Sequence, residues 1–235
     1  MEQIERNFLL VMLVIPFVEY ILSNFYAVGF VIYAIFVGTV LIVMENELGP
    51  TKEEKVLVFL MIIPICRLAE LFLNFNFFWN TLLFYFMVIG LVVYYAIKFK
   101  IKTRPFIGNP IYFIIVVIVA GIASVVAKQV LGWSFANLIF LLPIVAYGEE
   151  IFFRGGFQNL TSEWFGSFSI LFTSFIYAAF TISYGFSFVL IAFFASLVIS
   201  TIYHFTKNLY LSYVLNLIFQ VLIFVFYRGI FQSFL

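Results

Sequence analysis

The sequence predicts an all-α, polytopic membrane protein, a bundle of eight or nine transmembrane helices. Hydrophobic residues make up 66% of the chain and charged residues only 10%, whereas an average soluble domain is about 25% charged. The mean hydropathy is +1.19. The apolar residues also gather in stretches of about 20, which is the length that a helix needs to cross a bilayer. An integral membrane protein is therefore expected.

Nine apolar stretches predict membrane-spanning helices. Two of the joints between them are short, around Ser23–Phe25 and around Gly185. Either pair of stretches could instead form one broken or re-entrant helix, so eight spans remain the alternative to nine. The nine stretches are residues 7–22, 27–44, 54–73, 78–98, 110–131, 137–158, 167–184, 186–204 and 208–227.

The linker Lys98–Asn109 is the most polar connection and divides the chain in two. Residues 1–109 are expected to hold four spans and this linker, and residues 110–235 a C-terminal bundle. Lys and Arg accumulate in cytoplasmic loops, so we expect the linker and the N-terminus on the cytoplasmic side. The expected location is the plasma membrane of a prokaryote. The basic residues of the linker are Lys98, Lys100, Lys102 and Arg104.

The composition argues against several other classes of protein. A net charge of +1 gives no basic surface of the kind that binds nucleic acid. A single cysteine, Cys66, rules out a disulfide framework within the chain. Zinc sites use Cys, His or carboxylate ligands, and the chain has only one histidine, His204. We therefore expect no metal site and no cofactor.

One apolar stretch contains three charges within six residues, in the segment Tyr147–Gly156. A charge at the centre of a membrane helix costs about 2.5–3.5 kcal/mol on insertion scales, so these charges need a reason. Glu150 and Arg154 are four residues apart with the acid first, the favourable order for an ion pair on a helix. Glu149 lies about 100° around the helix from Glu150 and has no such local partner. Glu149 is therefore the acid that is available for a functional role.

The pattern Glu149-Glu150-x-x-Phe153-Arg154-Gly155 resembles the first motif, EExxFRG, of the CPBP family, also called Abi. That family includes the type II CAAX prenyl endopeptidases. The resemblance extends from Asn137 to Phe226. It implies an intramembrane endopeptidase that cleaves membrane-bound, sometimes prenylated, peptides with a glutamate-activated water.

The chain departs from the family at both histidines. The family has a His in the helix after the first motif and a His-x-x-x-Asn pattern in the last helix. Carried over, Thr181 replaces the first His, Asn216 the second His, and Gln220 the Asn, while His204 matches neither position. The resemblance thus implies two sets of site residues. The catalytic set is Glu149, Glu150, Asn216 and Gln220, and the structural or water-positioning set is Arg154 and Thr181.

These replacements change what the site is expected to do. Histidine suits proton transfer near neutral pH, and losing a positioned acid–base partner costs about 10²–10⁴ in rate. Asn216 and Gln220 lie on one helix face and can still donate hydrogen bonds to an oxyanion. The sequence therefore predicts a divergent family member with weak, altered or absent proteolysis.

Other functions are also compatible with the same residues. A non-catalytic membrane scaffold or regulator would use the polar positions to bind another membrane protein. A transporter also needs buried charges, but the chain shows no inverted repeat and no matching pair of broken helices. In every case the expected partners are the lipid bilayer and a membrane-bound peptide or protein. In a purely structural interpretation, Glu150 and Arg154 form an ion pair that stabilises the helix, and the Thr181 hydroxyl packs between helices.

The expected topology can be tested by cysteine labelling from outside intact cells. A cysteine at Lys100 should be protected and one at Trp133 accessible, because the basic linker is expected inside. The parent protein, with Cys66 in an apolar run, serves as the control. Labelling of position 100 from outside would overturn the orientation.

Overall fold

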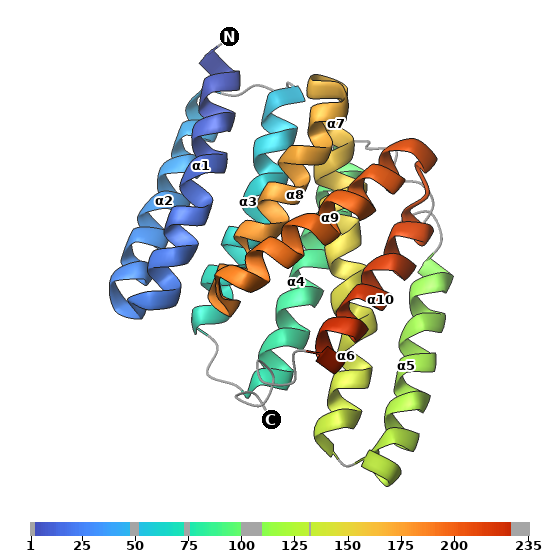
Figure 1. The fold of residues 1–235 in the computed structure, drawn as a ribbon. Helices are drawn as coiled ribbons and strands as arrows, with labels where there is room; N and C mark the ends of the chain where they lie inside the picture. The colour runs from blue at the N-terminus through green and yellow to red at the C-terminus, as the bar shows by residue number, and fades with distance from the viewer. Residues whose placement is uncertain (1–2, 48–51, 73–75, 100–109, 132, 227–235) are drawn as a thin grey trace. The chain divides into compact units, whose positions relative to one another are not determined.

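The computed structural model describes residues 3–47, 52–72, 76–99, 110–131 and 133–226. These residues are almost entirely helical and contain no strand, which confirms the all-α prediction (Figure 1). The main helices are α1 (Gln3–Asn24), α2 (Tyr26–Glu47), α3 (Lys52–Phe72), α4 (Phe77–Lys98), α5 (Pro110–Leu131), α6 (Trp133–Glu150), α7 (Asn159–Phe165), α8 (Ser169–Ala179), α9 (Phe186–Thr206) and α10 (Leu209–Phe226). The short segments are η1 (Ile151–Gln158), η2 (Gly166–Phe168) and η3 (Ile182–Tyr184).

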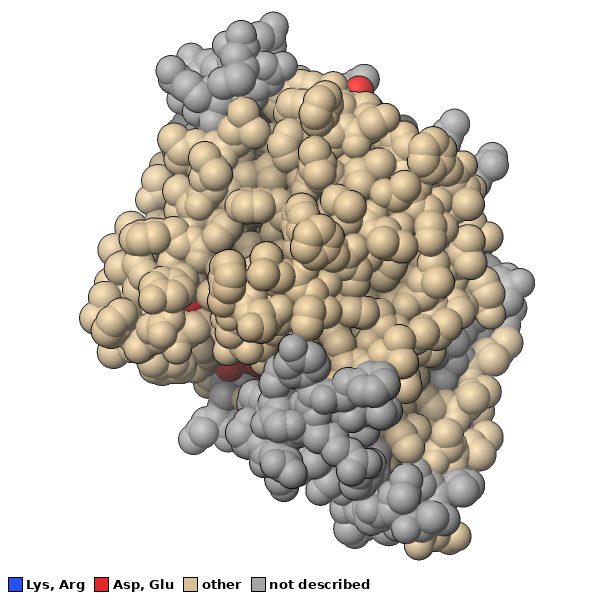
Figure 2. All heavy atoms as spheres, in the orientation of Figure 1, with Lys and Arg blue, Asp and Glu red and all other residues tan. Residues whose placement is uncertain are grey.

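Three helical segments of the described chain are long and apolar enough to cross a membrane. They are Phe78–Lys98, Ala136–Ala179 and Phe186–Thr206, and shorter apolar helices cover Phe8–Asn24, Tyr26–Ile42 and Leu209–Ile223. Figure 2 shows a face on which the described residues are almost all uncharged. These helices are those of an integral membrane protein, while the number of crossings, eight or nine, stays a prediction.

Both doubtful joints are breaks between helices. Helix α1 ends at Asn24 and α2 begins at Tyr26. Gly185 precedes α9 with a φ of +99°, a conformation that glycine adopts without steric cost. Residues 100–109 of the basic linker lie outside the described residues. The cytoplasmic location of the linker and the N-terminus therefore stays a prediction.

The chain forms two compact units, each built from separate parts of the sequence. The first comprises Met1–Ala69 and Phe157–Thr201, and the second Glu70–Gly156 and Ile202–Leu235. The expected division at residue 109 concerns membrane organisation and stays a prediction. The polar residues of interest are divided between these units, and each unit is described by itself.

In the first unit, α1 packs against α2 and α8. A hydrogen bond ties α1 to α2, since the Tyr33 hydroxyl donates to Glu19 Oε1 at 2.8 Å. Both side chains are buried, at 3% exposure for Glu19 and 1% for Tyr33. Glu19 thus has a partner that sequence spacing did not indicate. The ring of Phe8 packs within an aromatic cluster with Phe157, Trp164, Phe165 and Phe172.

In the second unit, α6 packs against α4, α5 and α10 (Figure 1). Helix α10 begins at a side-chain cap, because Asn208 Oδ1 accepts hydrogen bonds from the amides of Tyr210 (3.0 Å) and Leu211 (3.3 Å). Lys207 precedes this cap with a φ of 51°. The polar residues Lys207 and Asn208 thus introduce the last helix.

The buried Glu19–Tyr33 bond should contribute to stability. Tyr33→Phe removes one donor from a buried carboxylate, so we expect a loss of about 1–3 kcal/mol, measured as a lowered midpoint of thermal unfolding in detergent. Tyr20→Phe on α1 is the control, because Tyr20 is 55% exposed. Equal midpoints for the two variants would contradict a stabilising bond.

Candidate functional site

Glu149 lies at the centre of a polar network between three helices of the second unit. It is the next-to-last residue of α6. Its Oε1 accepts a hydrogen bond from the Tyr85 hydroxyl of α4 at 3.1 Å. Its Oε2 accepts from Asn216 Nδ2 at 3.0 Å and from Gln220 Nε2 at 2.9 Å, both on α10. Helical spacing predicts no local partner for Glu149, and these three partners are remote in the sequence.

The positions of Asn216 and Gln220 follow from the helix that carries them. They are four residues apart and therefore lie on one face of α10, as predicted. Both amides donate to the same carboxylate oxygen, Glu149 Oε2. Asn216 is fully buried, whereas Glu149, Gln220 and Tyr85 are partly exposed. The network thus runs from a buried end to a partly accessible one.

The carboxylate fixes the orientation of both amides. An ionised carboxylate only accepts hydrogen bonds, so the amide nitrogens must face Glu149 and the amide oxygens must face elsewhere. Asn216 Oδ1 and Gln220 Oε1 are buried and have no hydrogen-bond partner among the described residues. An unsatisfied buried acceptor is costly. These two oxygens are therefore acceptors suited to a water or to an N–H group of a ligand.

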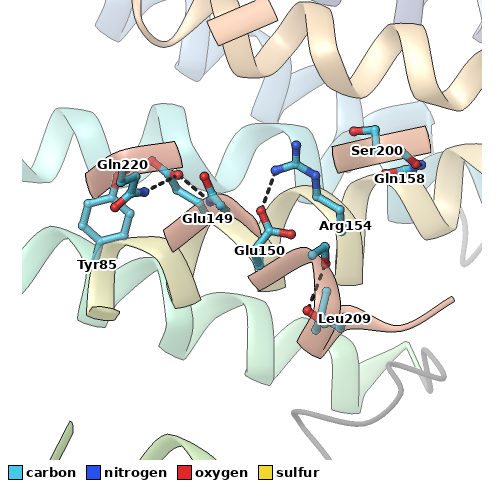
Figure 3. A network of polar contacts seen from close by, with 10 residues as sticks. Tyr85, Glu149, Glu150, Arg154, Gln158, Ser200, Leu209 and Gln220 are labelled. Carbon is cyan, nitrogen blue, oxygen red and sulfur yellow. Dashed lines mark hydrogen bonds and ion pairs between the residues drawn. The ribbon is translucent and has the colours of Figure 1, made fainter. Parts of the chain in front are cut away.

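Glu150 and Arg154 form the ion pair that their spacing predicts. Arg154 Nη1 lies 2.8 Å from Glu150 Oε1, and the two side chains are 0% and 1% exposed. The guanidinium carbon of Arg154 also lies 5.9 Å from the centre of the Phe153 ring. Figure 3 shows Glu150 facing Arg154, while Glu149 faces Tyr85 and Gln220. Adjacent glutamates thus have different kinds of partner.

The helix changes its winding directly after the two glutamates. Ile151–Gln158 is a π-helix, where the sequence predicted one continuous α-helix over 137–158. Gly155 and Gly156 lie inside it, and glycine imposes little restriction on the backbone. π-helical turns are rare and are frequently found at functional sites. The wider turn still leaves Arg154 in contact with Glu150.

Thr181 belongs to the first unit. The other predicted site residues belong to the second unit, namely Glu149, Glu150, Arg154, Asn216 and Gln220. Thr181 follows the end of α8, and its hydroxyl donates to the Ala178 carbonyl oxygen at 2.7 Å. A water-positioning role for Thr181 stays a prediction. His204 lies in the last turn of α9, where its ring is 5.5 Å from that of Phe205.

Tyr85 is the member of the network that sequence reasoning missed. It lies inside an apolar span, and the chain contains 14 tyrosines, so composition and spacing do not single it out. The available indication of a close neighbour at this point was Gly148, directly before Glu149. A Cβ atom at Gly148 would lie 2.7 Å from Tyr85 Cδ1, so Gly148 is required for α4 and α6 to approach this closely.

The described residues contain no group of three or more His, Cys, Asp or Glu side chains placed to hold a metal ion. The donor set around Glu149 consists instead of a carboxylate, two amides and a phenol. Such a set can bind and orient a water or a peptide by hydrogen bonds.

A comparison with known protein families gives a match to part of the chain. Residues 131–222 match the family described as type II CAAX prenyl endopeptidase Rce1-like. The matched segment includes Glu149, Glu150, Arg154 and the two α10 amides, but not Tyr85. Searches of curated proteins and of solved structures gave no match.

The ion pair and the Glu149 network should respond differently to the loss of one member. Arg154→Ala leaves Glu150 as an uncompensated buried charge, which costs about 3–5 kcal/mol. Glu149→Ala leaves neutral donors unsatisfied, at about 1–3 kcal/mol for such a group. We therefore expect a lower folded yield in detergent for Arg154→Ala than for Glu149→Ala, measured by size-exclusion chromatography. Equal yields would contradict a buried pair.

Proposed function

Because residues 131–222 are Rce1-like, we propose that this membrane protein is a divergent intramembrane endopeptidase that acts on membrane-bound, including prenylated, peptides. The observation that carries the proposal is the network in which Glu149 of the EExxFRG-like motif meets Asn216 and Gln220. These are the positions at which the family resemblance puts the catalytic glutamate and the two polar residues of the last helix.

In the proposed reaction, Glu149 is the base. Its carboxylate is an acceptor of hydrogen bonds, and Tyr85, Asn216 and Gln220 hold it in place. Glu149 takes a proton from a water, the resulting hydroxide adds to the peptide carbonyl carbon, and the carbonyl oxygen becomes an oxyanion. The Gln220 amide nitrogen has a second hydrogen that can stabilise this oxyanion. Glu149 then returns the proton to the leaving amine as the C–N bond breaks.

Glu150 and Arg154 have a supporting role in this proposal. The cation beside Glu150 neutralises that acid, so the two adjacent carboxylates differ in charge environment. The ion pair begins at the residue next to Glu149 and links the end of α6 to the π-helix that follows it. Glu150 therefore contributes to the site by orientation, and Glu149 by proton transfer.

The absence of the family histidines limits the expected rate. Asn216 and Gln220 donate hydrogen bonds to the Glu149 carboxylate. An amide, however, does not take up a proton near neutral pH, as histidine does. The proposed enzyme therefore lacks the second proton-transfer group of its relatives, and a rate lower by about 10²–10⁴ is expected.

A second candidate function is a non-catalytic module that binds a membrane-bound peptide or another membrane protein. The observation that favours it is the hydrogen bonding of Glu149 by Tyr85, Asn216 and Gln220, which ties α4, α6 and α10 together. Interhelical hydrogen bonds of this kind stabilise membrane bundles without any ligand.

Restoring the family residues tests the proposed activity. The double variant Thr181→His and Asn216→His should cleave a membrane-tethered peptide faster than the wild type, because titratable side chains are returned at both positions where the family has histidine. Adding Glu149→Gln should abolish the gain. Cleavage is measured by mass spectrometry of the released fragment in reconstituted vesicles.

The matched control is Glu163→Gln, the same change at an exposed residue of α7. It should leave cleavage unchanged. A wild type that cleaves at full rate and is not slowed by Glu149→Gln would overturn the site assignment. Inert wild-type and restored proteins that co-purify with a membrane protein would favour the second function.

A further inference from the structure

Tyr85 places a hydroxyl in the network from a part of the chain that the family match does not cover. It lies in α4, within the apolar span Phe78–Lys98, and donates to Glu149 Oε1 at 3.1 Å. Tyrosines in membrane proteins favour the interface, where the hydroxyl meets water. A tyrosine within a span that directs its hydroxyl to a carboxylate of another helix is a specific contact (Figure 3).

The place of the Tyr85 ring is determined by a second feature of the fold. A Cβ atom at position 148 would lie 2.7 Å from Tyr85 Cδ1 and 3.5 Å from Ile89 Cγ1. No larger residue fits there without displacing α4 or the ring. Gly148 directly precedes Glu149, so the residue that admits the ring and the residue that receives its hydrogen bond are adjacent.

The two oxygens of Glu149 accept hydrogen bonds from two different helices. Oε2 is bonded to the two amides of α10, and Oε1 is bonded to Tyr85 of α4. The terminal torsion of a glutamate side chain has a broad energy profile, so donors on one oxygen alone leave the carboxylate able to swing. A donor on the other oxygen removes that freedom.

We propose that Tyr85 is a positioning residue of this site, which fixes the Glu149 carboxylate plane through Oε1. The inference rests on the proposed function, because the carboxylate that it positions is the proposed base. It also extends the site beyond residues 131–222, since the residue that completes it comes from α4.

The experiment compares Tyr85→Phe with Tyr94→Phe in the full chain. Phenylalanine keeps the ring that packs on Gly148 and removes only the hydroxyl. Tyr94 is on the same helix and is 57% exposed. With a membrane-tethered peptide as substrate, Tyr85→Phe should lower kcat by about 10- to 100-fold, with KM unchanged, because a misplaced base slows chemistry and not binding. Tyr94→Phe should change neither constant.

A second measurement is independent of catalysis. A membrane-soluble carbodiimide modifies accessible carboxyl groups, and mass spectrometry gives its rate at Glu149, with the exposed Glu163 as internal reference. Tyr85→Phe should raise the rate at Glu149 several-fold, because Oε1 loses the donor that covers it. Gly148→Ala, which displaces the ring while keeping the hydroxyl, should act in the same direction.

The outcomes separate this inference from the proposed function. If the wild type is inert but Glu149 reacts faster in Tyr85→Phe than in Tyr94→Phe, the proposed hydrolysis fails and the positioning role stands. If the wild type cleaves and Tyr85→Phe leaves kcat unchanged, the inference is overturned while the function stands. An inert wild type with equal carbodiimide rates in both variants overturns both.

Discussion

The structure of the second unit depends on how two neighbouring carboxylates are accommodated in an apolar helix bundle. Glu150 is neutralised by a cation one turn further along its own helix. Glu149 is surrounded by three neutral donors from two other helices. The first arrangement joins two residues that are four positions apart. The second requires α4, α6 and α10 to meet at one point, so the fold and the candidate site are the same set of contacts.

The parts of this arrangement that follow from local rules could be predicted from the sequence. Hydropathy predicted an all-helical membrane protein, because a span needs about 20 predominantly apolar residues. Spacing gave the Glu150–Arg154 pair, and it put Asn216 and Gln220 on one face of α10. The motif resemblance directed attention to Glu149, and the family match over residues 131–222 supports that resemblance.

The remaining features are set by tertiary contacts that a single sequence does not encode in a periodic pattern. Tyr85 differs from other tyrosines only in what lies opposite it, and that depends on how α4 crosses α6. The π-helix at Ile151–Gln158 interrupts a stretch whose hydropathy fits an ordinary helix. The two compact units each combine early and late parts of the chain, whereas the polar linker indicates a division by order in the sequence. Side-chain partners and helix crossings decide these features.

The origin of the donors around Glu149 has a consequence for biosynthesis. A chain is made from its N-terminus, so Tyr85 is already present when Glu149 is synthesised. Asn216 and Gln220 come 67 and 71 residues later. During insertion, the nascent helix that carries Glu149 must therefore enter the membrane with only one of these three donors available. Tyr85 is thus the first of these three donors that the growing chain can offer to the carboxylate.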